Sequence, residues 1–297
     1  MLKVVVCRIK PKEAEAQSSS ANSIMSELRF MAPCYTRCVA RSANRKRKVS
    51  RSERLAFGIH AVEEALRKGE VERLVLLDGG SGDASLLEDL ALKRGVPVAR
   101  HPERYLISVV GRVPHQGVVA YVRPFAYANL QALLDARAPL VVCCGIEDPG
   151  NLGAVLRAAA GLGAGGVFVS DVGSARVTAS VRKGAAGCLH KVPLARGSVL
   201  EFLENAREIR RPVLAAVPSG GLDIAKTAPP RTNRANSSRD EPLEEAPVLV
   251  VGSEGRGVPE EVLALADERL TIPLHRDVES LNVAVAVGLL LWWATGR

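Results

Sequence analysis

Near the C-terminus, glycines and polar side chains stand at the ends of segments that are otherwise apolar. The loop Gly252–Gly257 (Gly-Ser-Glu-Gly-Arg-Gly) follows the strand-like run 248–251 and precedes a helix opened by Pro259. A loop between a strand and a helix can bind a small ligand through its backbone groups. Further along, Ser280 and Asn282 stand in front of an apolar helical segment. Because the neighbouring positions already supply a core, these polar groups are candidates for binding and catalysis.

A second polar loop, at 145–153, leads from an apolar strand into a helix that carries Arg157. Asp148 and Asn151 can cap this helix, and the N–H groups of its first turn suit a phosphate or a ribose. Asn151 and Arg157 are separated by about one and two-thirds helical turns, so they lie on roughly related faces. The alternative is an ordinary capped helix with one solvated arginine.

Other glycine-rich and catalytic motifs are misplaced or absent. The run 161–166 follows a helix and precedes a strand, the reverse of the order in a dinucleotide-binding fingerprint, so it indicates a turn. The loop 252–257 lacks the G-x-G-x-x-G spacing and the acidic residue expected about 20 positions later. No Walker A, HExxH or GxSxG sequence occurs, and none of the five histidines has a partner at metal-ligand spacing. We therefore expect no metal.

The positive charge of the chain is concentrated at its N-terminus. The 297 residues have a formal charge of +8, but the first 54 carry +9 and the remaining 243 carry −1. A nucleic-acid-binding surface in the folded part must therefore depend on locally placed Lys and Arg. Hydrophobic residues make up 47%, enough for a substantial core, and no uncharged apolar run reaches 18 residues. We expect a soluble protein with no membrane span.

Residues 1–53 are predicted to be a disordered basic extension, because they lack sustained hydrophobic periodicity. They could be an organelle transit segment, a basic arm that binds RNA, or the product of a start upstream of the natural one at Met31; three acidic residues argue against the first. The six cysteines show no metal-ligand pattern and are expected to be reduced thiols. We expect a cytoplasmic protein, or an organellar one if the extension is a transit segment.

The rest of the chain divides into two α/β segments. Residues 54–125 alternate short strands and helices, which predicts a small α/β domain, and 126–138 is expected to be a linker helix. From 139 to 297, near-continuous apolar strands, one of them expected at 191–193, alternate with helices. This pattern predicts a parallel sheet covered on both faces. Residues 219–246 are rich in Pro, Ser, Asn and charge, and are predicted to be a disordered surface insertion.

Taken together, these residues resemble the three ordered motifs of the SpoU (TrmH-like) RNA 2′-O-ribose methyltransferases of the SPOUT superfamily. The first motif matches 151–158, the second matches 249–257, and the third extends from Ile272 to Val283. This resemblance covers the chain from about Pro139 to the C-terminus. Residues 57–118 look like the L30e-like substrate-binding domain of members that modify 23S-type rRNA.

The resemblance implies a SPOUT α/β trefoil-knot catalytic domain with a parallel sheet, preceded by a small L30e-like α/β domain. It also implies a homodimer whose active site borrows groups across the interface, and S-adenosyl-L-methionine as the methyl donor. Ala284 stands where several members have serine, so one hydroxyl contact is expected to be missing. By position, the residues expected to bind the cofactor are Gly252, Ser253, Gly257, Ile272 and Leu281. Those expected at the catalytic end are Asn151, Arg157, Glu254, Ser280 and Asn282.

Methyl transfer from a sulfonium to a ribose 2′-hydroxyl chiefly requires alignment and the removal of one proton. The family account gives Arg157 the task of activating the hydroxyl. With a pKa above about 12 an arginine is a poor base, so we expect Arg157 to hold the adjacent phosphate and stabilise the developing alkoxide. Asn151 and Asn282 would orient the ribose and Arg157, and Glu254 would fix Arg157 or its own loop by a charge-assisted hydrogen bond.

The substrate implied by the resemblance is a guanosine of large-subunit rRNA, with tRNA as the alternative. Two other classes of protein stay open. A non-catalytic RNA-binding ribosome-assembly factor with a vestigial cofactor site would explain Ala284 and the basic extension, although the intact set of polar residues weighs against it. A nucleotide-dependent α/β enzyme would use the loop 252–257 to bind ATP or NAD.

Overall fold

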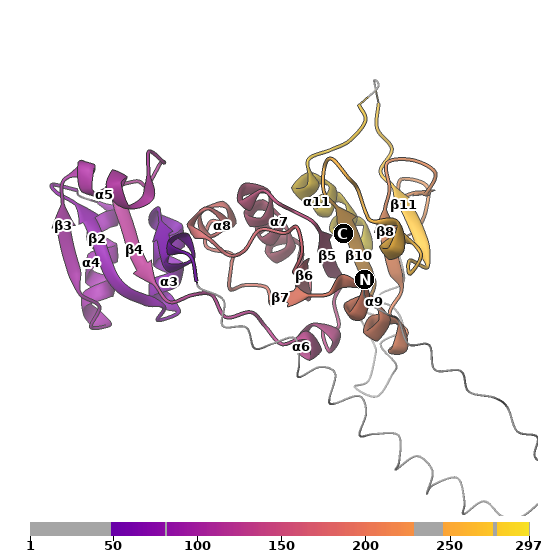
Figure 1. Cartoon of the computed structure of the whole chain (residues 1–297), viewed down its shortest axis with the longest axis horizontal. Helices are drawn as coiled ribbons and strands as arrows, with labels where there is room; N and C mark the ends of the chain where they lie inside the picture. Colours follow the sequence, from indigo (N-terminus) through magenta and orange to yellow (C-terminus); the bar gives the residue numbers. More distant parts are fainter. Residues whose placement is uncertain (1–48, 81, 229–245, 276–277, 297) are drawn as a thin grey trace, which may run out of the picture. The chain divides into compact units, whose positions relative to one another are not determined.

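The computed structural model describes residues 49–80, 82–228, 246–275 and 278–296 (Figure 1). Nearly all of the expected basic extension and most of the expected insertion lie outside these ranges. Within them the chain forms two sheets, one of four strands and one of seven. No helix of the described part is long and apolar enough to cross a membrane.

The four-stranded sheet is built from residues 55–122, with the strand order β1-β4-β2-β3. β4 is antiparallel to β1 and β2, while β2 and β3 are parallel and are joined through α4. Helices α3 and α4 cover one face and α5 covers the other. The elements are η1 (Arg51–Arg54), β1 (Leu55–Phe57), α3 (Ile59–Arg67), β2 (Val71–Leu77), α4 (Asp83–Lys93), β3 (Val98–His101), α5 (Glu103–Val110) and β4 (Val118–Val122).

The seven-stranded sheet has the order β7-β6-β5-β10-β8-β11-β9, and all its strand pairs are parallel. Helices α7, α8 and α11 cover one face, and α6, α9 and α10 cover the other. This confirms the prediction of an α/β fold with a buried parallel sheet. The strands are β5 (Leu140–Cys144), β6 (Gly166–Ser170), β7 (Leu194–Gly197), β8 (Val213–Ala216), β9 (Leu222–Asp223), β10 (Val248–Gly252) and β11 (Glu268–Thr271). The helices are α6 (Leu130–Leu134), α7 (Pro149–Leu162), α8 (Ala179–Ala185), α9 (Val199–Glu208), α10 (Glu260–Leu263) and α11 (Val283–Ala294).

Three local predictions were wrong. The expected linker helix over 126–138 is reduced to α6, whose start is fixed by the cap that Asn129 provides to the N–H of Gln131. The strand expected at 191–193 lies at Leu194–Gly197, so it begins directly after Pro193 rather than including it. The insertion expected to be disordered from residue 219 includes β9, which pairs with the edge strand β11.

Helices α7 and α8 cross at two glycines. A Cβ atom built on Gly153 would lie 2.8 Å from the Cα of Gly184 and 2.8 Å from the carbonyl oxygen of Val181. No side chain separates the two backbones at this point, so the start of α7 is held directly against α8.

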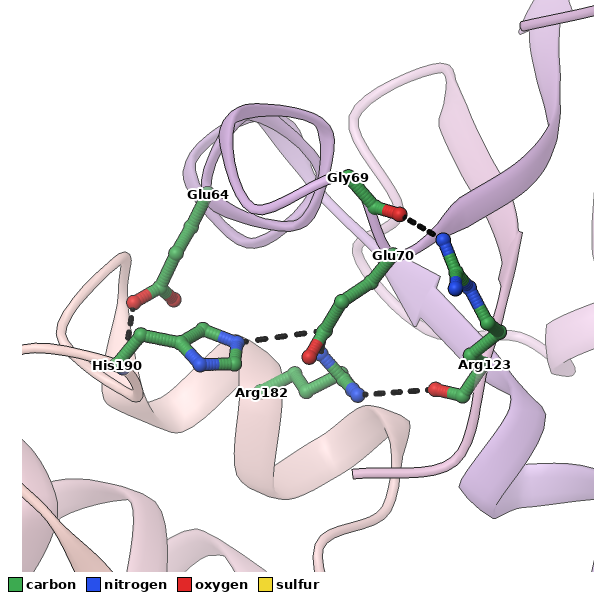
Figure 2. Close-up of polar contacts among 6 residues, drawn as sticks. All are labelled: Glu64, Gly69, Glu70, Arg123, Arg182 and His190. Carbon is green, nitrogen blue, oxygen red and sulfur yellow. Dashed lines mark hydrogen bonds and ion pairs between the residues drawn. The ribbon is translucent and has the colours of Figure 1, made fainter. Parts of the chain in front are cut away.

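Polar contacts join α8 and the segment after it to the small sheet (Figure 2). The side chain of Arg182, 2% exposed, donates to Glu70 at 2.7 Å and to the carbonyl of Arg123 at 3.4 Å. The Nε2 of the His190 ring lies 3.3 Å from the same Glu70 carboxylate. The backbone N–H of His190 donates to the side chain of Glu64. Burial opposes ionisation of Glu70, but its interactions with His190 and with the charge of Arg182 outweigh it, so its pKa is lowered.

Arg211 is fully buried just before β8 of the large sheet. Its guanidinium donates to four carbonyl groups, three of which belong to the last residue of α6 and the segment that follows it. The fourth acceptor is Ala246, just before β10. Burial lowers the pKa of Arg211 to about 10, which leaves it charged at neutral pH. The Arg211 side chain therefore holds both the segment that leads into β5 and the residue just before β10.

Candidate active site

Three polar side chains from three different segments meet at the carboxyl edge of the large sheet. The Nδ2 of Asn282 donates to the Oδ1 of Asn151 at 2.9 Å and to the Oε1 of Glu254 at 3.1 Å. The Nδ2 of Asn151 donates to the same Glu254 oxygen at 3.0 Å. We call Asn151, Glu254 and Asn282 the amide–carboxylate cluster. Glu254 is an exposed residue, and within the described part of the chain its second carboxylate oxygen has no hydrogen-bond partner.

Local structure explains why these side chains converge. Strands β5 and β10 are adjacent and parallel, with Gly252 opposite Cys144, so the loops that follow them leave the sheet side by side. Asp148 caps α7 by accepting from the N–H of Asn151 at 2.8 Å, which fixes Asn151 in the first turn. Asn282 caps α11 by accepting from the N–H of Ala284, so its amide nitrogen is turned toward the other two residues.

Beside the cluster lies a cavity of about 440 Å³, a size suited to a cofactor. Its walls are largely apolar, with backbone groups and a few polar side chains at the rim. All five residues expected to bind the cofactor line it, together with Glu254 and Ser280: Gly252, Ser253, Gly257, Ile272 and Leu281. The remaining walls include Ala216–Pro218 and Leu274, which the sequence analysis did not identify.

The glycines give the loop 252–257 its shape. The N–H of Gly257 donates to the carbonyl of Ser253 at 2.8 Å, and Gly257 has a φ of +66°. A Cβ on Gly252 would lie 1.9 Å from the carbonyl carbon of Gly257, so only glycine fits there. The loop therefore closes on itself and presents its backbone, rather than side chains, to the cavity.

A second cavity, of about 300 Å³, is lined by the same loop together with Asn151 and Asp148. It shares Ser253, Glu254 and Val283 with the larger cavity. A molecule in the smaller cavity would therefore meet a ligand in the larger one at Glu254. This arrangement suits transfer of a small group between two bound molecules.

Arg157 does not join the cluster. It is exposed on α7 and, among the described residues, has no hydrogen bond or ion pair. Within the described part of a single chain, Glu254 binds Asn151 and Asn282 and makes no contact with Arg157, so the expectation that it fixes Arg157 stays a prediction. The other expectation for Glu254, that it fixes its own loop, agrees with these contacts.

The sequence analysis missed the support of the polar loop at 145–148. The Ser170 hydroxyl accepts from the N–H of Gly145, and the Ser174 hydroxyl accepts from the N–H of Ile146. Arg196 then donates to the carbonyls of Asp171, Ser174 and Ala175. No spacing in the sequence reveals this support, since it depends on β5, β6 and β7 being neighbours.

Within the described part of the chain, no group of His, Cys, Asp or Glu is arranged to hold a metal ion. Cys143 and Cys144 are free and buried in β5. Burial raises the pKa of both thiols, that of Cys144 to about 12, so neither is a reactive thiolate at neutral pH.

Comparison with known proteins agrees with this geometry. The profile of the SpoU rRNA Methylase family matches residues 138–292, and that of the RNA 2′-O ribose methyltransferase substrate-binding domain matches residues 55–128. A TrmH family tRNA/rRNA methyltransferase of Staphylococcus epidermidis is 30% identical over 79% of this chain and 92% of its own length. A tRNA/rRNA methyltransferase of Mycobacterium avium is 33% identical over 79% of this chain and 74% of its own length.

Solved structures show the same fold. An rRNA methyltransferase from Sinorhizobium meliloti, determined with bound AdoMet, superposes with a TM-score of 0.65 at 24% identity, covering 82% of this chain and 86% of that one. The SpoU methyltransferase AviRb of Streptomyces viridochromogenes superposes with a TM-score of 0.64 at 23% identity, covering 82% of this chain and 90% of that one.

The fold and the site define an S-adenosylmethionine-dependent RNA 2′-O-ribose methyltransferase. The chain belongs to the SpoU rRNA methylase family. The larger cavity fits the cofactor, because its apolar walls suit an adenosyl group while the backbone of the loop 252–257 offers polar contacts at the rim.

Proposed function

We propose that this protein methylates the 2′-hydroxyl of a guanosine in large-subunit rRNA. The observation that carries the proposal is the amide–carboxylate cluster at the boundary of the two cavities. The family profile and the substrate-binding domain support an RNA ribose as acceptor. The choice of large-subunit rRNA and of guanosine rests on the resemblance of the small domain to that of 23S-type enzymes.

The chemistry assigns a task to each member of the cluster. The cofactor, when bound, supplies a methyl group on a positively charged sulfur. As the ribose oxygen bonds to this methyl carbon, the carbon–sulfur electron pair goes to sulfur and the hydroxyl proton must leave. We assign acceptance of that proton to the second oxygen of Glu254, and the hydrogen bonds from the two asparagine amides to the first oxygen support this role by holding the carboxylate in position.

Among the described residues of one chain, Arg157 makes no contact with the amide–carboxylate cluster. Its role is therefore assigned to the site of a second subunit. Helix α11 packs along α7, with Asn282 beside Asn151 and Gly288 beside Leu162, and Arg157 lies between these two contacts in the sequence of α7. Three apolar side chains on one face of α11 are exposed: Val285 (51%), Leu289 (38%) and Trp292 (55%). Their spacing is that of a helix–helix contact.

We propose a homodimer in which this face of α11 is buried. In that arrangement Arg157 reaches the site of the partner subunit, holds the phosphate next to the target ribose and stabilises the developing alkoxide. The deep trefoil knot implied by the family resemblance is part of the same proposal. It is compatible with the central place of β10, between β5 and β8.

The test is methyl transfer from tritiated S-adenosylmethionine to unmodified large-subunit rRNA, with total tRNA as a parallel substrate. Isothermal titration in the same preparation measures cofactor binding. We expect transfer to rRNA, retained cofactor binding in Arg157→Ala and loss of transfer in that variant. Transfer to tRNA alone would mean that the substrate is tRNA and not rRNA. Cofactor binding without transfer to either RNA would favour a ribosome-assembly factor.

A further inference from the structure

The small domain carries a group of stacked side chains that the catalytic chemistry does not use. Arg73 of β2 and Tyr121 of β4 are cross-strand neighbours, and the guanidinium carbon of Arg73 lies 4.3 Å from the centre of the Tyr121 ring. The same guanidinium donates to the hydroxyl of Tyr105 at 3.3 Å. The Tyr105 ring in turn stacks on His101, with ring centres 4.0 Å apart and an angle of 19°. We call Arg73, His101, Tyr105 and Tyr121 the stacking platform.

Core packing does not account for the platform. Arg73 is exposed and the three rings are only partly buried, at the margin of the cluster between the sheet and α5. Aromatic residues are scarce, since Phe, Trp and Tyr make up 4% of the chain, yet two of its four tyrosines are here. In the part of the chain that the structure describes, no carboxylate pairs with Arg73. Its charge and its outward π face are therefore available to a ligand.

The charge balance of the domain narrows the kind of ligand. Between residues 55 and 128 there are nine Lys or Arg and nine Asp or Glu side chains, a net charge of zero. A domain with this balance gains little from general attraction to phosphates. Flat side chains held in fixed planes instead recognise unpaired bases, which stack on aromatic rings and on arginine guanidinium planes.

We propose that the stacking platform binds an unpaired nucleobase of the RNA substrate. The base stacks on the outer face of the Arg73 guanidinium, which Tyr121 supports from below and Tyr105 holds in plane. Every base has a π face, so the platform selects unpaired over paired RNA rather than one base over another. The inference rests on the proposed function for its ligand class, RNA, and adds the surface and the structural form of RNA that it takes.

Substitutions that separate stacking from charge test the platform. Arg73→Lys keeps the positive charge and loses the planar face, and Tyr105→Leu keeps apolar bulk and loses the ring. The matched control is Arg94→Lys, at the exposed end of α4 on the other layer of the domain. The probe is a fluorescein-labelled hairpin RNA with an unpaired loop, and the same stem closed as a full duplex serves as the paired comparison. Binding is followed by anisotropy from about 50 to 200 mM salt.

We expect Arg73→Lys and Tyr105→Leu to weaken binding of the loop RNA at least about fivefold. The salt dependence should be unchanged in Arg73→Lys, because the number of charges is the same. Binding of the duplex, and binding by Arg94→Lys, should match wild type. In methyl transfer, KM for RNA should rise while kcat and cofactor affinity stay the same.

If Arg73→Lys binds the loop RNA with wild-type affinity, the proposal that the platform binds a base is wrong. It is also wrong if Arg94→Lys loses as much affinity for the loop RNA as Arg73→Lys does. Failure of the wild-type protein to prefer the loop over the duplex would overturn it as well. If the platform variants weaken RNA binding but the wild-type protein methylates no RNA, the platform stands and the proposed function fails. If methylation occurs and the variants behave as wild type, only the platform fails.

Discussion

The amide of Asn282 donates a hydrogen bond of 2.9 Å to the amide oxygen of Asn151, 131 positions earlier in the chain. Each residue stands at the start of a helix, α11 and α7 respectively, so the bond joins two helix N-termini. Glu254 accepts from both amides and places its negative charge there. Helix N-termini favour a negative charge, so these two helix starts are a suitable place for the carboxylate of Glu254.

Asn282 has two separable tasks, and one substitution divides them. Asn282→Ser keeps an oxygen that can cap α11 but loses both amide donors, so we expect a thermal midpoint close to wild type and a kcat lower by about a hundredfold. Asn282→Ala loses the cap as well and should cost about 1 kcal/mol of unfolding free energy. Thermal unfolding and single-turnover transfer measure the two effects. Full activity in Asn282→Ser would mean that the amide donors are dispensable.

Gly153 and Gly161 lie in the same helix but in opposite surroundings. A Cβ at Gly153 would meet backbone atoms of α8, whereas a Cβ at Gly161 would meet nothing within 4 Å. We expect Gly153→Ala to lower the free energy of unfolding by about 1–3 kcal/mol through overpacking. Gly161→Ala should instead raise it by roughly 0.5–1 kcal/mol, since alanine is the better helix former. Urea denaturation of both variants measures these changes in the free energy of unfolding. Equal changes in the two variants would refute the close crossing of α7 and α8.

The sequence predicted the parts of the site that depend on local order along the chain. The glycines at the ends of two apolar strands, Gly145 directly after β5 and Gly252 at the end of β10, and the polar residues that start α7 and α11 identified the segments that meet. Which side chains contact one another was less predictable, because it depends on strand order. Once β5 and β10 are neighbours, Glu254 lies within hydrogen-bond reach of Asn151.

The same reason explains the cavity walls that were missed. Ala216–Pro218 follow β8, which lies next to β10 only because the sheet order is not the sequence order. β9 has only two residues and is recognisable only through its pairing with β11.

The Glu70–Arg182 pair predicts how stability changes in acid. The folded-state pKa of Glu70 lies below its ordinary value of 4.5, so its contribution is fully present above that value and is lost as pH falls through the lower, folded-state pKa. Glu70→Gln should therefore flatten the loss of stability below pH 4.5. At pH 7 it should cost about 3 kcal/mol, because Arg182 is left buried without its counter-charge.

The control for that experiment is Glu63→Gln, which removes an exposed pair with Arg67 one turn along α3. We expect this change to cost a few tenths of a kcal/mol, roughly the value of a surface helix pair. Urea midpoints at pH 7 and between pH 5 and 3 measure both variants. A similar small cost for Glu70→Gln would show that the joint between the two sheets does not depend on the buried pair.

The exposed face of α11 gives a prediction about assembly. The wild-type protein should have the mass of a dimer by light scattering, and Trp292→Glu should be a monomer, because a carboxylate would be buried in the interface. Leu92→Glu is the control, since Leu92 of α4 is equally exposed but lies outside α11. A monomeric wild type, or a dimeric Trp292→Glu, would refute the proposed interface.

Mixing two inactive variants shows whether Arg157 acts in its own subunit or in the partner. When Arg157→Ala and Glu254→Gln subunits exchange freely, half of the dimers are mixed. If Arg157 serves the partner's site, each mixed dimer has one site with an intact Arg157 and an intact Glu254, so the mixture recovers about a quarter of wild-type transfer. If Arg157 serves its own subunit, every site lacks one of the two residues and the mixture stays inactive. Recovery therefore requires both a dimer and a shared site, a combination that the exposed position of Arg157 on α7 predicts.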